Sequence, residues 1–203
     1  MEFKTERAPS SLIFRPASYV ERIHPAEIFP AVQPLEVELG SGDGSFIIEW
    51  ARRNPEKNFL AVERLMGRLR KVDRKGLRAG LTNLRAMRIE AGYCLEFLLP
   101  PESVTALHVY FPDPWPKRKH RKNRLVNERF TEVVEKVLAP SGVIYLRTDD
   151  ADYFSQMMEV FGANANFERV EAPAELLAVL TDFEREFLKR GVATLRAAYR
   201  LAR

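Results

Sequence analysis

The chain has 203 residues, of which 46% are hydrophobic and 30% charged, and its formal net charge is +4 at pH 7. This length suits one sizeable core, and the composition argues against long disordered segments. No apolar run approaches the roughly 20 residues that a membrane helix needs, and the charged first residues do not read as a signal peptide. We therefore expect a cytoplasmic protein that has no membrane partner.

Cysteine and histidine are scarce. The single cysteine, Cys94, excludes a disulfide within the chain. The three histidines, His24, His108 and His120, are scattered and show no metal-ligand spacing. We therefore expect no metal centre.

Strand-like and helical patterns alternate along most of the chain. Residues 1–33 hold several prolines and little periodicity, so they predict an irregular N-terminal arm, and residues 34–203 predict a single domain. The alternation is typical of a mostly parallel sheet with helices on both faces, an α/β fold. In chain order we expect strands at 35–39, 59–63, 84–90, 104–111, 143–148 and 192–201, and helices at 45–53, 64–79, 128–138, 152–161 and 182–190.

A glycine-rich turn follows the first predicted strand, at the edge where open parallel sheets bind ligands. The residues from 38 to 44 read Glu-Leu-Gly-Ser-Gly-Asp-Gly, which places glycines at 40, 42 and 44. Closely spaced glycines permit a tight turn and a close approach of a ligand to the backbone. The spacing G-x-G-x-G differs from the dinucleotide pattern G-x-G-x-x-G.

Carboxylates end the first three predicted strands. Glu63 is placed to bind two ribose hydroxyls, which fits an adenosyl group. Glu38 would repel a pyrophosphate but suits the cationic end of S-adenosylmethionine, and Glu90 could face an adenine amino group. Two alternatives stay open: Glu36 and Glu38 could share a solvated strand face, and Glu90 could be no more than a polar strand end.

An aspartate between prolines follows the fourth predicted strand. Residues 112–116 read Pro-Asp-Pro-Trp-Pro, and three prolines hold the backbone around Asp113 rigidly. A carboxylate can accept hydrogen bonds from the N1 and N2 edge of guanine, and Trp115 could stack on the base. The alternative is a rigid turn that carries a solvated aspartate.

A basic segment continues directly from this turn. Residues 117–124 contain six cations and no acid, which predicts a phosphate-binding patch on the rim of the site. A solvated charged face is the alternative. The six are Lys117, Arg118, Lys119, Arg121, Lys122 and Arg124.

Together these stretches resemble the bacterial tRNA (guanine-N7)-methyltransferase family, which modifies a guanosine in the variable loop of tRNA. The resemblance implies a Rossmann-like class I methyltransferase fold, S-adenosylmethionine as cofactor, and tRNA as partner. For the assembly we expect a monomer or a homodimer. The most specific motif is Pro-Asp-Pro-Trp-Pro-Lys. The matching stretches are 37–44, 59–63, 110–117 with 120–125, 146–149 and 181–184.

The resemblance also implies roles for single residues. Asp113 would be catalytic, and Glu90 stands where the family often has aspartate. The segment 181–184 also fits a helix capping box, with Thr181 and Glu184 as its two members. The implied cofactor contacts are Glu38, Gly40, Gly42, Gly44, Glu63, Glu90 and Asp113, and the implied substrate contacts are Lys117, Asp149, Thr181, Asp182, Phe183 and Glu184.

Guanine N7 has a lone pair and no proton, so its methylation needs no general base. A nearby carboxylate would stabilise the positive charge that the ring gains, and we assign this role to Asp113. Two other functions remain open. An amino-group methyltransferase is one, because Asp113-Pro114-Trp115 loosely resembles the Asp-Pro-Pro-Tyr motif of those enzymes, and a non-catalytic RNA-binding protein on the same scaffold is the other.

Overall fold

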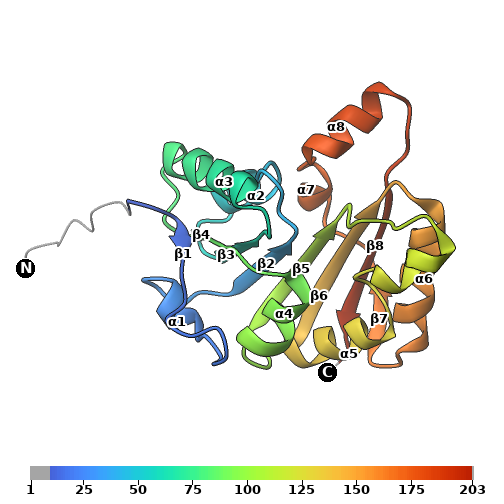
Figure 1. The fold of residues 1–203 in the computed structure, drawn as a ribbon, viewed down its shortest axis with the longest axis horizontal. Coiled ribbons are helices and arrows are strands. Elements are labelled where there is room, and N and C mark those ends of the chain that lie inside the picture. The colour runs from blue at the N-terminus through green and yellow to red at the C-terminus, as the bar shows by residue number, and fades with distance from the viewer. Residues whose placement is uncertain (1–9, 203) are drawn as a thin grey trace, which may run out of the picture.

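One mixed sheet organises residues 10–202, the part of the chain that the computed structural model describes (Figure 1). Its strand order is β1-β4-β3-β2-β5-β6-β8-β7, with parallel pairing from β1 to β6. Strand β8 runs antiparallel to β6 and to β7. The strands are β1 (Ile13–Phe14), β2 (Leu35–Leu39), β3 (Asn58–Val62), β4 (Leu84–Met87), β5 (Val104–Tyr110), β6 (Leu138–Thr148), β7 (Phe167–Val170) and β8 (Leu195–Leu201).

The predicted fold class is confirmed, and each predicted strand is present. All five residues of β2 and all five of β3 are buried, as expected for central strands that are covered on both faces. Two strands were not predicted, namely β1 and β7. Both lie at an edge of the sheet and are short, so they lack a long apolar run.

Helices cover both faces of this sheet. Figure 1 shows α2 and α3 over the β3–β4 half, and α6 beside β7 and β8. Helix α5 begins after Asn127, whose side chain accepts a hydrogen bond from the Phe130 amide at 3.0 Å, so the predicted N-cap is confirmed. The helices are α1 (Pro25–Ile28), α2 (Ile47–Arg53), α3 (Met66–Arg78), α4 (Ala91–Tyr93), α5 (Glu128–Val137), α6 (Ala151–Ala163), α7 (Ala174–Leu177) and α8 (Asp182–Lys189), with a π-helical turn η1 (Cys94–Leu98) and a 3-10 turn η2 (Arg118–Asn123).

Two apolar layers, one on each face of the sheet, form the core. One layer packs η1, α5 and α6 against the sheet, with Phe130, Tyr153 and Phe161 buried in it. The other packs α2, α3 and α7 against the opposite face, through side chains such as Trp50 and Val72. The two layers hold the sheet between them, and the carboxyl ends of the parallel strands lie at one open edge of the sheet.

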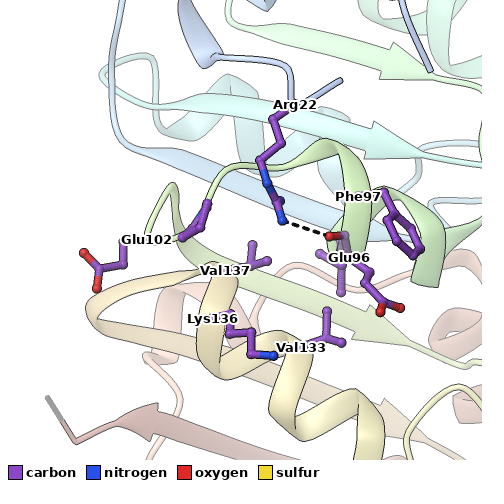
Figure 2. Close-up of a pocket in the computed structure, with 9 residues that line it drawn as sticks. Arg22, Glu96, Phe97, Glu102, Val133, Lys136 and Val137 are labelled. Carbon is purple, nitrogen blue, oxygen red and sulfur yellow. Dashed lines mark hydrogen bonds between the residues drawn. The ribbon is translucent and has the colours of Figure 1, made fainter. Parts of the chain in front are cut away.

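The N-terminal segment is irregular over most of residues 10–33, but the structure anchors it at several points. Leu12 and Phe29 are buried, and the Leu12 amide donates to Asp73 of α3 at 2.6 Å. Arg22 reaches a cavity of about 470 Å³ beside η1, where its guanidinium donates to the carbonyl of Glu96 (Figure 2). The same guanidinium donates to the carbonyl of Leu99. Residues 1–9 of the predicted arm lie outside the described residues.

No helix within residues 10–202 is long and apolar enough to cross a membrane. The same residues contain no group of three or more His, Cys, Asp or Glu side chains that could hold a metal ion.

Candidate active site

A cleft of about 430 Å³ opens at the carboxyl ends of β2, β3 and β5. This is the edge that the sequence predicted for the ligand, and in Figure 1 the arrowheads of β2 and β5 point toward it. Four of the predicted site residues line the cleft, namely Gly40, Glu63, Glu90 and Asp113. Other lining residues are Arg64, Arg68, Tyr110, Phe111, Trp115 and Leu125.

The glycine turn leaves its backbone accessible. Gly40 and Gly42 adopt φ values of +72° and +57°, and a Cβ added at either would meet nothing within 4 Å. A ligand can therefore approach this backbone closely. Gly44 differs, because an added Cβ would lie 2.8 Å from the Ile48 side chain, so this glycine serves the packing of the turn against α2.

Glu63 holds the glycine turn against the end of β3. Its side chain is largely buried and accepts hydrogen bonds from the Gly42 amide at 3.0 Å and from the Leu65 amide at 2.7 Å. Each carboxylate oxygen thus already has one backbone donor. Free lone pairs remain on both oxygens for a ligand on the cleft side.

Glu38 lies directly before the glycine turn and is 3% exposed, so it is not on a solvated face. Its Oε2 atom has no hydrogen-bond partner, and neither does the buried hydroxyl of Ser41. Burial raises the pKa of Glu38 well above its usual value of 4.5, against the opposing charge of Arg147. Unsatisfied buried polar atoms are rare in proteins, and neither of these two residues lines the cleft itself.

Glu90 is placed differently from the prediction. Strand β4 ends at Met87, and Glu90 lies three residues later as the N-cap of α4. Its carboxylate accepts from the amides of Gly92 at 2.9 Å and Tyr93 at 2.7 Å. The predicted strand end was therefore wrong, although the residue still lines the cleft.

The Pro-Asp-Pro-Trp-Pro turn has backbone strain on both sides of Asp113. Phe111 and Trp115 adopt φ values of +51° and +44°, which non-glycine residues seldom do. Such conformations cost about 1–3 kcal/mol each and persist only where the surroundings enforce them. One enforcing contact is the bond from Arg124 Nε to the Pro114 carbonyl at 2.7 Å. Asp113 and Trp115 are both exposed toward the cleft.

Arg124 corrects the prediction for the basic segment. It is 2% exposed, and its guanidinium also donates to Asp152 at 2.6 Å and to Gln156 at 2.8 Å. The buried Arg124 guanidinium is occupied by these three partners and cannot contact a phosphate. The prediction that Arg124 belongs to the phosphate-binding patch was therefore wrong. The other five cations of the segment are exposed, and Arg121 pairs with Asp152 at 2.8 Å.

The segment 181–184 begins α8. The predicted capping box is confirmed: the Thr181 hydroxyl accepts from the Glu184 amide at 3.0 Å, and Glu184 accepts from the Thr181 amide at 2.9 Å. Both side chains are buried. Asp182 and Phe183 are exposed, and the Phe183 ring lies 5.7 Å from that of Phe111 at the rim of the cleft.

Two further predicted substrate contacts are exposed side chains at the same edge of the sheet. Asp149 follows the end of β6 directly. Lys117 precedes the first residue of η2. Their contacts with the substrate stay predictions.

Arg147, which the sequence reasoning did not single out, links α8 to the cleft. It is 2% exposed, donates to Glu184 at 2.8 Å and to the Val179 carbonyl at 2.8 Å, and lies 4.2 Å from the centre of the Tyr110 ring. Tyr110 lines the cleft. The only sequence signal was an arginine in an apolar strand, inside a stretch quoted for the family resemblance.

A hydrogen-bonded chain beneath the cleft was also missed. The Glu36 carboxylate accepts from Trp50 Nε1 at 2.7 Å and from Lys57 at 2.8 Å, and lies 2.9 Å from His108 Nε2. His108 Nδ1 lies 2.8 Å from the Tyr110 hydroxyl. Burial lowers the pKa of His108, so we assign it as neutral, donating to Glu36 and accepting from Tyr110. Glu36 is 4% exposed, which excludes the solvated alternative for this residue.

These hydrogen bonds make the free energy of unfolding depend on pH. Burial alone would raise the pKa of Glu36, but the hydrogen bonds from His108 and Lys57, together with the charge of Lys57, lower it from 4.5 to about 2. A carboxyl with a lowered pKa stabilises the fold above pH 4.5, and this contribution is lost as pH falls toward 2. We expect Glu36→Gln to flatten the acid dependence of the unfolding free energy by on the order of 3 kcal/mol in that window.

Urea unfolding from pH 7 to pH 2.5 measures this dependence. The control is Glu168→Gln, which removes a carboxylate from an exposed pair with Arg200 and should leave the profile nearly unchanged. Parallel profiles for the wild type and Glu36→Gln would show that the chain does not depress the pKa of Glu36.

The sheet order, the glycine turn at the end of β2 and the cleft beyond it define a class I methyltransferase. Solved structures share this fold. The 16S rRNA methyltransferase KamB aligns with a TM-score of 0.60 at 18% identity over 90% of this chain and 96% of its own. A 30S ribosomal A1408 methyltransferase from an uncultured bacterium aligns with a TM-score of 0.62 at 17% identity over 89% and 95%.

Sequence comparison identifies the family. Residues 32–197 match the family model described as "Putative methyltransferase". A tRNA (guanine-N(7)-)-methyltransferase from Syntrophotalea carbinolica is 38% identical over 82% of this chain and 73% of its own length. Those from Halorhodospira halophila and Rubrobacter xylanophilus are 33% and 32% identical, over 86% and 88% of this chain and 78% and 82% of their own lengths. The chain belongs to the tRNA (guanine-N(7)-)-methyltransferase family.

Proposed function

We propose that the cleft binds S-adenosylmethionine and a tRNA guanosine together, and that Asp113 directs methylation of guanine N7. The family to which the chain belongs carries out this reaction, and by resemblance the target lies in the variable loop. The observation that supports the assignment best is the shared cleft. The glycine turn, Glu63 and the proline-bracketed Asp113 come from three different strand ends and line one cavity.

The residues present fit the cofactor. When bound, S-adenosylmethionine supplies the methyl group from a positively charged sulfonium. The open backbone at Gly40 and Gly42 admits a ligand, and Glu63 retains acceptor capacity for ribose hydroxyls. We assign Glu38 to the cationic end, because its unpaired buried oxygen needs a positive or donating partner.

Glu90 and Gly44 have less direct roles in cofactor binding in this proposal. Glu90 is exposed in the cleft and could accept from the adenine amino group through the lone pairs that its two backbone donors leave free. Gly44 contributes through the packing of the turn.

The protein's part in methyl transfer is alignment and charge stabilisation. Guanine N7 presents a lone pair and no proton, so no side chain has to act as a general base. Asp113 would accept from the N1 and N2 edge of the base, and its charge would compensate the positive charge that develops on the ring. Trp115, 36% exposed beside it, offers a surface on which the base can stack.

Around the cleft, we assign substrate contacts to Lys117, Asp149, Asp182 and Phe183, all of which are exposed. Thr181 and Glu184 serve the substrate in another way in this proposal: their capping box and the Glu184–Arg147 pair set the position of α8. The tRNA substrate supports a cytoplasmic location. For the assembly, the proposal is a monomer or a homodimer.

Incubation with S-adenosylmethionine and unmodified tRNA, followed by nucleoside analysis, tests the function. We expect 7-methylguanosine at one position of the tRNA. An N-methylated adenosine would support the amino-group alternative, and binding of tRNA without any methylated nucleoside would support the RNA-binding alternative.

Glu38 yields a separate prediction about the cofactor. Because burial favours its neutral form and a cation favours its carboxylate, binding of S-adenosylmethionine should release a proton from Glu38. Affinity should therefore rise with pH through the raised pKa. Calorimetric titration in buffers of different ionisation enthalpy measures the proton released.

The matched variant is Glu38→Gln, which has the same shape and no titrating proton. It should bind more weakly, with a binding enthalpy that no longer depends on the buffer. Equal proton release by the wild type and Glu38→Gln would assign the proton to another group and remove Glu38 from the cationic end of the cofactor.

A further inference from the structure

Helix α3 carries a basic face that the proposed function does not use. Its 13 residues include six cations and one acid, Asp73. That acid is turned toward the N-terminal segment, where it accepts from the Ser11 hydroxyl at 3.1 Å and the Leu12 amide at 2.6 Å. The apolar side of the helix, with Leu69 and Val72, is buried in the core. Five cations are exposed: Arg68, Arg70, Lys71, Arg74 and Arg78.

These five cations make no ion pair within residues 10–202, and the sixth, Lys75, pairs with Asp43 at 2.6 Å. Of the fourteen exposed arginines elsewhere in residues 10–202, eight pair with carboxylates. Examples are Arg52 and Arg53 with Glu49, Arg129 with Glu96, Arg190 with Glu186, and Arg200 with Glu168. Uncompensated like charges on one helix repel one another, so an external anion would stabilise this face.

The position of α3 ties this face to the cleft. The helix follows β3, and its first turn brings Arg68 into the lining of the cleft beside Arg64. The exposed cations of the 117–122 segment follow β5. Since β3 and β5 flank β2 on opposite sides, the two basic segments lie on opposite sides of the cleft.

Helix α3 extends about 20 Å from the cleft, given its 13 residues and a rise of about 1.5 Å per residue. Figure 1 shows it along one side of the sheet, with α8 across the open edge. The charged face is thus long enough to contact several phosphates of one RNA strand that enters the cleft.

We propose that the exposed basic face of α3 binds the sugar–phosphate backbone of the tRNA, on the side of the cleft opposite residues 117–122. The proposal rests on the function proposed above and adds a second anchoring surface. Unpaired arginines suit phosphate because the guanidinium can donate two parallel hydrogen bonds to it. Contacts of this kind hold the RNA without reading its sequence, so the surface supplies affinity and orientation.

The test is the full-length triple variant Arg70→Gln/Lys71→Gln/Arg74→Gln, in which glutamine preserves helix propensity. These three residues do not line the cleft. Binding of unmodified tRNA is measured at several salt concentrations. Each phosphate contact contributes about 0.7–0.9 to the log–log salt slope, so we expect the slope to fall by about 2–3. Affinity for S-adenosylmethionine should stay unchanged, and so should turnover at saturating tRNA.

The matched control is Arg52→Gln/Arg129→Gln/Arg200→Gln, which removes the same charge from paired positions on other elements. For this control, the log–log salt slope of tRNA binding should differ from the wild-type slope by no more than about 1. If the α3 variant binds tRNA with the wild-type slope, or weakens binding only as much as the control does, the proposal is overturned. A wild type that neither binds nor methylates tRNA would instead overturn the proposed function, and the α3 surface with it.

Discussion

Asp113→Ala is expected to lower the rate of methyl transfer to tRNA by about a hundred- to a thousandfold, the usual cost of removing one electrostatic stabiliser. The loss should appear at saturating S-adenosylmethionine and tRNA, because Asp113 acts on charge that develops during the reaction. The fold should persist, since the Asp113 side chain is exposed and the turn is held by prolines and by Arg124. Single-turnover kinetics measures the rate.

Asp113→Asn separates charge from shape. It keeps the size of the side chain and an acceptor oxygen but loses the negative charge, so it should recover little of the rate. Thermal unfolding of both variants serves as the control and should match the wild type. Turnover of Asp113→Ala within about threefold of the wild-type rate would remove Asp113 from the mechanism.

Arg147→Met should destabilise the fold by about 3–5 kcal/mol, because it leaves Glu184, which is 0% exposed, without its buried partner. The variant also loses the guanidinium bonds to the Leu176 and Val179 carbonyls. Urea unfolding measures the change in free energy. Since Arg147 lies against Tyr110 and holds α8, methyl transfer should fall as well.

Arg196→Met is the matched control. Arg196 binds the same carboxylate at 2.9 Å, but its side chain is 37% exposed, so its loss should cost less than about 1 kcal/mol. The double variant Arg147→Met/Glu184→Met removes the buried carboxylate together with its buried partner and should recover part of the loss. Equal stabilities for Arg147→Met and Arg196→Met would show that burial does not strengthen the Arg147 pair.

The central strands could be predicted from sequence because each is a short, mainly apolar run of residues that is bounded by turns. The predicted bounds of β2, 35–39, are those of the structure. The short edge strands β1 and β7 could not be predicted, since their pairing depends on neighbours far along the chain, such as Ile13 with Ala86. Glu90 was misplaced because an acid that caps a helix and an acid that ends a strand have the same local sequence.

The site residues also divide into those that the local sequence predicts and those that depend on distant partners. Glycines at 40 and 42 and Asp113 could be found because backbone freedom and proline bracketing act locally. The roles of Arg124 and Arg147 could not, because their partners lie about 30 residues away, as with Asp152 and Val179. A cation in a basic segment looks like a surface cation until the fold shows which carbonyls and carboxylates surround it.

The most direct test of N7 as the methylated atom compares two tRNA transcripts, one with guanosine and one with 7-deazaguanosine at every guanine position. The two transcripts differ only in whether atom 7 is a nitrogen with a lone pair. Labelled S-adenosylmethionine and the wild-type protein should methylate the guanosine transcript and leave the 7-deazaguanosine transcript unlabelled, while both bind with similar affinity. Incorporation of methyl groups into the 7-deazaguanosine transcript at a comparable rate would contradict methylation at N7.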